Sequence, residues 1–119
     1  MGSILNDVKK MSGLPPENKD FDQDLILFIN AAFSTLSQLG VVPPQGYSIQ
    51  DDTSDWDEVI SNDVYNDVKT YVYLRVRMLF DPPSVGVLAN TFESQIKELE
   101  WRLNVKREED RWTVQPPLF

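Results

Sequence analysis

The chain has 119 residues, with 19 acidic and 11 basic side chains and a net charge of −8. Its length fits one domain with a single core. The sequence contains neither cysteine nor histidine, which excludes disulfide bonds, zinc thiolate sites and histidine-based acid–base catalysis. This composition favours a binding or structural protein over an enzyme.

The acidic excess lies in the first half of the chain. Residues 1–63 carry eleven acids and three lysines, whereas residues 64–119 carry eight acids and eight bases. Proteins that grip nucleic acid need a basic surface, so we do not expect such binding here. The excess is either ordinary solubilising charge or a surface that repels DNA sliding past it. The start of the chain lacks the apolar core of a signal peptide, so we expect an intracellular protein.

Two helices are predicted before residue 41. Ser3 is a suitable N-cap for a short amphipathic helix over residues 4–11, and Gly13 supplies its end. The second helix is expected over Asp22–Leu39, with acids near its start and Gly40 after its last leucine. Its polar positions are few and almost uncharged. This pattern indicates a helix that is buried on more than one side or packs against another subunit.

A long connection over residues 41–54 follows, rich in proline and glycine. Loops of this length without regular structure are often functional. Tyr47 and Ile49 lie within it and could form a short strand edge or a partner-binding surface. An inert surface loop is the alternative.

Acidic side chains crowd the end of this connection and the residues after it. They are Asp51, Asp52, Asp55, Asp57 and Glu58. They lack the alternating spacing and the central glycine of a calcium-binding loop, so we expect no metal and no cofactor. Instead, Ser54 or Asp55 is expected to cap a short turn that carries Trp56, Val59 and Ile60.

Apolar residues then recur at spacings of three and four over residues 64–79 and again over residues 85–103. Both stretches match the pattern of an amphipathic helix. Between them lie Asp81, Pro82 and Pro83, where the prolines cannot continue a helix. The sequence predicts two helices joined by a hinge at these three residues.

Three side chains stand out on these two helices. Arg75 and Arg77 are expected to pair with acids of neighbouring helices rather than to bind a ligand. Trp101 lies about 200° around the helix from Leu99, away from the apolar stripe that continues to Leu103. It is predicted to cover a local edge or, in an oligomer, to anchor a partner.

The helical pattern ends near residue 105. Residues 1–105 are expected to form the helical domain, and residues 106–119 an extended C-terminal arm. The arm supplies five candidate partner-binding residues: Arg111, Trp112, Val114, Leu118 and Phe119. Disordered tails usually lack aromatic residues, so this arm is expected to bind a partner or to fold back on its own domain.

Two stretches resemble a known family. They are ILNDVKKMSGLPPENKDFDQDLILFINAAFSTLSQLGV and YVYLRVRMLFDPPSVGVLANTFESQIKELEWRLN, the second of which contains the Asp-Pro-Pro hinge. Both resemble tailed-phage head–tail connector proteins, also called adaptors, from phages and prophages of Gram-positive bacteria. The resemblance covers residues 3–105 and includes no catalytic signature.

The resemblance implies an all-α fold, a small bundle of four to five helices. It also implies that copies of the chain form a ring, commonly of twelve, beneath the portal protein of the virion. Such a ring extends the DNA channel, lets DNA pass without specific binding, and offers a docking surface to a stopper or tail-completion protein. The expected location is the head–tail interface of the virion, with the host cytoplasm during assembly. No reaction and no membrane are implied.

Two other functions remain open from the residues alone. The first is a cytoplasmic helical module of a phage or prophage that binds one partner or regulates it through its tail. The second is a nuclease that holds a metal ion with Asp55, Asp57 and Glu58.

Overall fold

The computed structural model describes residues 2–41, 47–60 and 64–114, and gives the helix alone for residues 106–114. The elements are α1 (Ile4–Met11), α2 (Asp22–Gln38), the 3₁₀ helix η1 (Trp56–Glu58), α3 (Tyr65–Phe80) and α4 (Gly86–Val114). Within these residues no strand forms, and only an isolated bridge joins Ser3 to Asp55. The predicted all-α fold is confirmed, with four α-helices.

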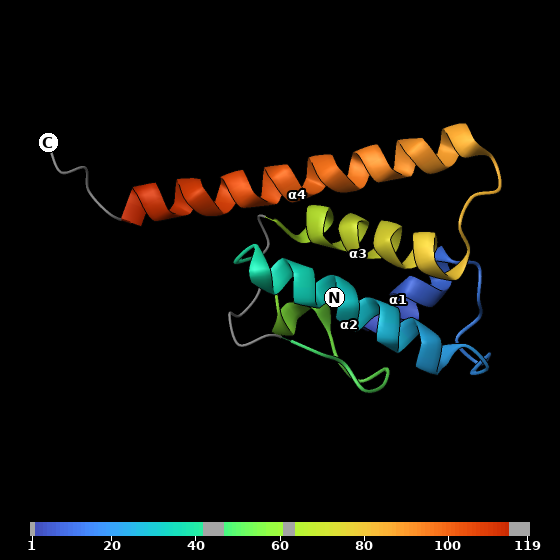
Figure 1. The fold of residues 1–119 in the computed structure, drawn as a ribbon. Coiled ribbons are helices and arrows are strands. Elements are labelled where there is room, and N and C mark those ends of the chain that lie inside the picture. Colours follow the sequence, from blue (N-terminus) through green and yellow to red (C-terminus); the bar gives the residue numbers. More distant parts are fainter. Residues whose placement is uncertain (1, 42–46, 61–63, 115–119) are drawn as a thin grey trace, which may run out of the picture.

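The helices α2, α3 and α4 form a stack with α3 in the middle (Figure 1). The outer helices α2 and α4 run in the same direction, and α3 runs against both of them (Figure 1). The short α1 packs beside α2. Helices α2 and α4 therefore each pack on α3 and leave their other sides for further contacts.

The predicted helix ends are confirmed by their caps. The Ser3 hydroxyl oxygen accepts a hydrogen bond from the backbone N–H of Asn6 at 3.3 Å, which makes Ser3 the N-cap of α1. Gly13 and Gly40 adopt φ angles of 81° and 80° just after α1 and α2. These positive angles strain residues with a side chain, so glycine is the residue that ends a helix in this way.

The core combines apolar side chains from every element. Its members include Ile4, Leu5, Val8, Leu25, Ile29, Phe33, Leu36, Trp56, Val68, Tyr71, Val72, Val76, Leu99 and Leu103. Trp56 is its largest fully buried side chain, and its indole N–H donates to the Asp7 carboxylate at 2.8 Å. Lys69 pairs with the same carboxylate at 3.3 Å. Asp7 thus joins α1, η1 and α3 at one point. Asp55 occupies the predicted N-cap position of η1, although its side chain makes no capping hydrogen bond.

The apolar stripe of α4 is covered over only part of its predicted length. Ile96, Leu99 and Leu103 are buried against α3, whereas Val85 and Leu88 are exposed. The reason is geometric, because α3 and α4 diverge toward the hinge that joins them (Figure 1). Amphipathic spacing predicted that a helix forms here but not where its stripe is covered.

The predicted end of the last helix near residue 105 was wrong. Helix α4 continues to Val114, so the segment 106–114, expected to belong to an extended arm, is helical. Lys, Arg and Glu are good helix formers, and the first proline after the hinge is Pro116. The end of α4 projects past the ends of α2 and α3 (Figure 1). Residues 115–119 lie outside the described part of the chain.

A lysine is buried where α1 meets the start of α2. The side chain of Lys9 is 1% exposed, and its ammonium nitrogen lies 2.8 Å from the Asp22 carboxylate. The same nitrogen donates a hydrogen bond to the backbone carbonyl of Pro16 at 2.9 Å. Because a buried charge is costly unless it is paired, these contacts tie the connection between the two helices to α1.

Replacing Lys9 with Met should lower the free energy of unfolding by about 1–3 kcal/mol, because the variant leaves Asp22 without its cation. Lys10 is the matched control, since it is the adjacent lysine and is exposed. Lys10→Met should change stability by less than about 0.5 kcal/mol. Urea denaturation of both variants measures the difference, and equal losses would contradict the assigned role of Lys9.

Candidate docking surfaces

The hinge is confirmed as the break between α3 and α4. Asp81 is the C-cap of α3, and its carbonyl accepts a hydrogen bond from Nε of Arg77 at 2.8 Å. Pro82 and Pro83 follow before α4 begins.

Apolar side chains that are not fully covered surround this end of the stack: Phe21, Leu79, Phe80, Val85 and Leu88. The rings of Phe21 and Phe80 meet edge to face at 5.2 Å. The hinge end is thus a partly apolar surface.

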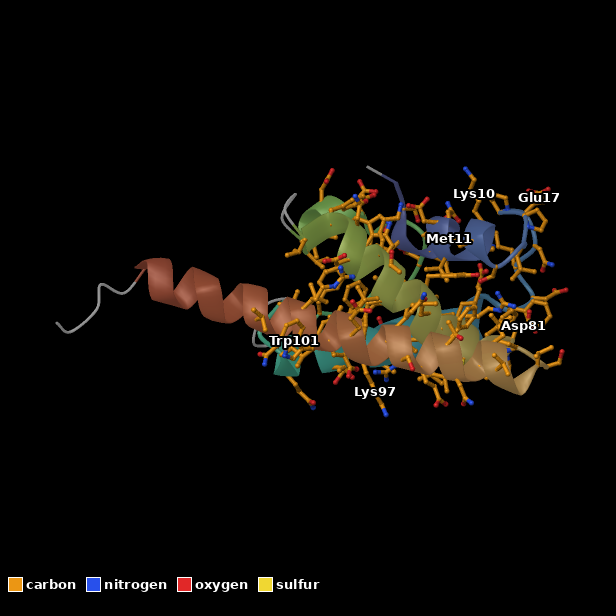
Figure 2. All side chains as sticks on the ribbon, turned by 90° about the horizontal axis from the view of Figure 1, so that it is seen from above. Lys10, Met11, Glu17, Asp81, Lys97 and Trp101 are labelled. Carbon is orange, nitrogen blue, oxygen red and sulfur yellow. The ribbon has the colours of Figure 1, made fainter. Side chains whose placement is uncertain are left out.

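Trp101 lies on the outward side of α4 and is 65% exposed. It faces away from the buried stripe formed by Ile96, Leu99 and Leu103, as the helical spacing predicts. Figure 2 shows Trp101 and Lys97 on the opposite side of the molecule from Lys10 and Met11 of α1. A tryptophan this exposed is an available anchor for another protein surface.

The two candidates in the 41–54 connection differ in their surroundings. The Tyr47 hydroxyl donates to the Glu58 carboxylate at 3.0 Å, and its ring meets Phe33 edge to face at 5.3 Å. Partial burial raises the pKa of this phenol. Tyr47 remains partly accessible, so it stays a candidate contact residue.

The prediction that Ile49 binds a partner was wrong, because its side chain is 1% exposed and belongs to the core. Asn30 of α2 bonds to both backbone groups of Ile49, the carbonyl and the N–H. The Asn30 amide donates to the Ile49 carbonyl at 3.0 Å and accepts from the Ile49 N–H at 2.8 Å. An amide on an otherwise apolar helix is the sequence signal that could have indicated this backbone contact.

The remaining candidates lie at the C-terminal end. Arg111, Trp112 and Val114 belong to the last turns of α4, where the structure describes the helix and not the side chains. Leu118 and Phe119 lie outside the described residues. All five stay predictions for partner contacts.

A polar cluster joins the three stacked helices. The Tyr71 hydroxyl donates to the Glu100 carboxylate at 2.7 Å and accepts from Arg75 at 2.8 Å. Arg75 also lies 3.6 Å from Glu100 of α4 and donates to the Thr35 hydroxyl of α2 at 3.4 Å. The prediction that Arg75 pairs with an acid of a neighbouring helix is confirmed. For Arg77 the nearest acid is Asp81, at 3.9 Å, just past the end of its own helix.

A surface hollow of about 460 Å³ opens between α1 and α3. It is lined by Asp7, Lys10, Met11, Asn66, Lys69 and Thr70. Lys69 is already engaged there, since it pairs with Asp7 and lies over the rings of Trp56 and Tyr65 at 5.9 and 5.2 Å. The ion pair between Asp7 and Lys69 in this hollow therefore holds α1 to α3.

No group of three His, Cys, Asp or Glu side chains within the described residues is placed to hold a metal ion. Of the acids considered for a nuclease, Glu58 accepts the Tyr47 hydrogen bond, and Asp55 lies at the N-cap of η1. The helices in the described part of the chain are also too short or too polar to cross a membrane.

The family model described as phage connector protein matches residues 4–110. Searches of curated proteins and of solved structures give no match. Because the family match spans most of the chain, this protein belongs to the phage connector family. It is therefore a structural component of a virion and interacts with other virion components. The match confirms the resemblance seen in the two helical stretches.

Replacing Trp101 with Ala should change the free energy of unfolding by less than about 1 kcal/mol, because its side chain is mostly in water. The buried neighbour Leu103 is the comparison, and Leu103→Ala should cost about 2–5 kcal/mol. Urea denaturation measures both. At equal amounts of folded protein, Trp101→Ala should weaken assembly with other virion components more than Leu103→Ala does. A large stability loss for Trp101→Ala would place that ring in the core.

Alkaline pH should destabilise the fold through Tyr71. The pKa of Tyr71 is raised to about 12 from an ordinary value of 10.0, chiefly by burial and next by the hydrogen bond to Glu100. The folded state therefore keeps a proton that the unfolded state loses above pH 10, so this stabilisation is complete below about pH 10 and is lost as the pH rises toward 12.

Ultraviolet absorbance of tyrosinate during alkaline titration measures this effect. Tyr71→Phe should remove the step with the highest pKa, whereas Tyr73→Phe, at a less buried position of the same helix, should leave that step in place. A titration in which Tyr71 ionises together with the other tyrosines would contradict the assigned environment.

Proposed function

We propose that copies of this connector form a ring, of twelve subunits, beneath the portal protein. The ring extends the DNA channel and gives the stopper or tail-completion protein its docking surface. No chemical step is involved, because the protein acts through its shape and its contacts. It assembles in the host cytoplasm and remains at the head–tail interface of the virion.

The observation that carries this proposal is the arrangement of α4. Only one side of the helix, around Ile96, Leu99 and Leu103, packs on the body, while Trp101 faces outward. The C-terminal part of α4 then reaches past the other helices (Figure 1). Within one copy, most side chains of residues 86–105 of this helix are exposed, which fits a protein whose remaining contacts are made by other subunits.

The acidic excess supports a role beside passing DNA. Exposed acids such as Asp24 and Asp51 belong to the first half of the chain, which carries the negative charge. Hydrogen bonds from Thr53 lower the pKa of the Asp51 carboxyl, which keeps it ionised. Negative side chains along a channel repel the DNA phosphates, so the duplex slides without being held.

The two ends of the channel need separate contacts. We assign these to the 41–54 connection, through Tyr47, and to the C-terminal segment 106–119. One of them meets the portal protein and the other meets the stopper.

Electron microscopy of lysates from the parent phage lacking this gene tests the proposed position. Heads that have packaged DNA and then lost it, alongside separate tails, are the expected result, because the joint between head and tail is missing. Complete, infectious virions would overturn the proposal and favour a regulatory role in the cytoplasm.

Returning altered genes to the same phage provides the controls. The full gene should restore infectious virions, and a gene encoding residues 1–108 should not, although its product keeps the melting temperature of the full chain. The truncation removes only the projecting end of α4 and the residues after it. Full restoration by the truncated gene would show that this end makes no required contact.

A further inference from the structure

The outward face of α2 is exposed and, after Asp24 in the first turn, uncharged. It consists of Leu27, Ala31, Ser34 and Gln38, spaced by four, three and four residues. Leu27 is 65% exposed, and the buried side of the helix lies opposite, around Ile29 and Leu36. A leucine in water on such a face is a candidate contact with another helix.

The outward face of α4 has a matching pattern. Val87, Thr91, Ser94, Glu98 and Trp101 follow one another at spacings of four and three residues, opposite the stripe that packs on α3. Among the described residues, the three most exposed large apolar side chains are Val87 (77%), Leu27 (65%) and Trp101 (65%). All three lie on these two outward faces.

The two faces are positioned to meet when copies stand side by side. They belong to two helices that both pack on α3 and that run in the same direction (Figure 1). Placing α4 of one copy on α2 of the next continues the stack without reversing any helix. Residues that alternate at spacings of three and four on both helices allow packing with a crossing angle of about 20°.

The levels of the two faces also agree. Arg75 contacts both Thr35 of α2 and Glu100 of α4, so these residues lie at about the same height in the stack. With about 1.5 Å per residue, Trp101 of one copy then lies level with the gap between Ser34 and Gln38 of its neighbour. This holds when neighbours are related by rotation without a rise, as a closed ring requires.

We propose that the outward face of α4, centred on Val87 and Trp101, packs on the outward α2 face, centred on Leu27 and Ser34, of a second copy of this chain. This inference rests on the proposed ring and names the surfaces that close it. A copy is the fitting partner because only a copy supplies the missing face on each side of the stack. Each chain carries a net charge of −8, so a mostly uncharged contact also brings like-charged copies together with least repulsion.

Cysteine bridging tests the inference directly, because the natural chain contains no cysteine. The full chain carrying Ala31→Cys and Ser94→Cys is treated with a short bis-maleimide at a protein concentration of about 1 mM, at which contacts with a Kd near 1 mM are populated. The two positions face away from each other within one chain, so a bridge must join two copies. We expect a ladder of dimers, trimers and larger species.

Two controls match this variant. Thr70→Cys with Ser94→Cys places the first cysteine on α3, away from both outward faces, and should give no ladder. Adding Leu27→Glu to the Ala31→Cys and Ser94→Cys chain should abolish the ladder. Because Leu27 is mostly exposed, this change should leave the melting temperature unaltered.

The outcomes separate the inference from the proposed function. Oligomers detected by analytical ultracentrifugation in which Ala31 and Ser94 are not bridged would overturn these surfaces and leave the ring possible. Equal bridging of both cysteine pairs, or a chain that stays monomeric and unbridged at about 1 mM, would also overturn the inference. The position of the protein in the virion is judged independently by electron microscopy of the phage lacking the gene.

Discussion

The structure depends on a polar contact beneath the middle of α4. Tyr71 and Arg75 of α3 bond to Glu100 of α4, and Arg75 also reaches Thr35 of α2. Apolar stripes hold helices together but allow them to slide, because hydrophobic burial has no direction. Hydrogen bonds to charged groups are directional and therefore fix the relative heights of the three helices. This contact sets the level at which α2 and α4 present their outward faces.

Helix periodicity predicted the elements and most of the core, because each helix carries a stripe that must be buried. It could not predict where a stripe stays uncovered. Leu88 and Leu99 occupy equivalent positions in the pattern of α4, yet only Leu99 is buried. The difference comes from the angle between α3 and α4. The periodicity of apolar residues does not encode this angle. The C-terminal end of α4 was not predicted because its charged residues show no periodic pattern of apolar side chains.

Candidate contact residues were harder to predict than the fold. The exposure of Trp101 was predicted correctly, because a large ring opposite a buried stripe has nothing in its own helix to cover it. Ile49 was misassigned because the burial of a loop residue depends on a distant partner, here Asn30 of α2. A single sequence shows the amide and the isoleucine but not that they meet. Periodic segments therefore allow better predictions of side-chain burial than loops do.

The residues that stabilise the fold and those proposed for assembly occupy opposite sides of the same helices. Leu99 and Leu103 of α4 face α3, whereas Val87 and Trp101 face outward. The core that the described residues form belongs to a single copy, so we expect the chain to fold as a monomer before its copies meet. If the outward face of α4 binds the outward face of α2 on the next copy, copies add in one direction. Both faces of every copy are then occupied only when the first and last copies join. In the proposed ring, both of these faces of every copy are covered by its neighbours.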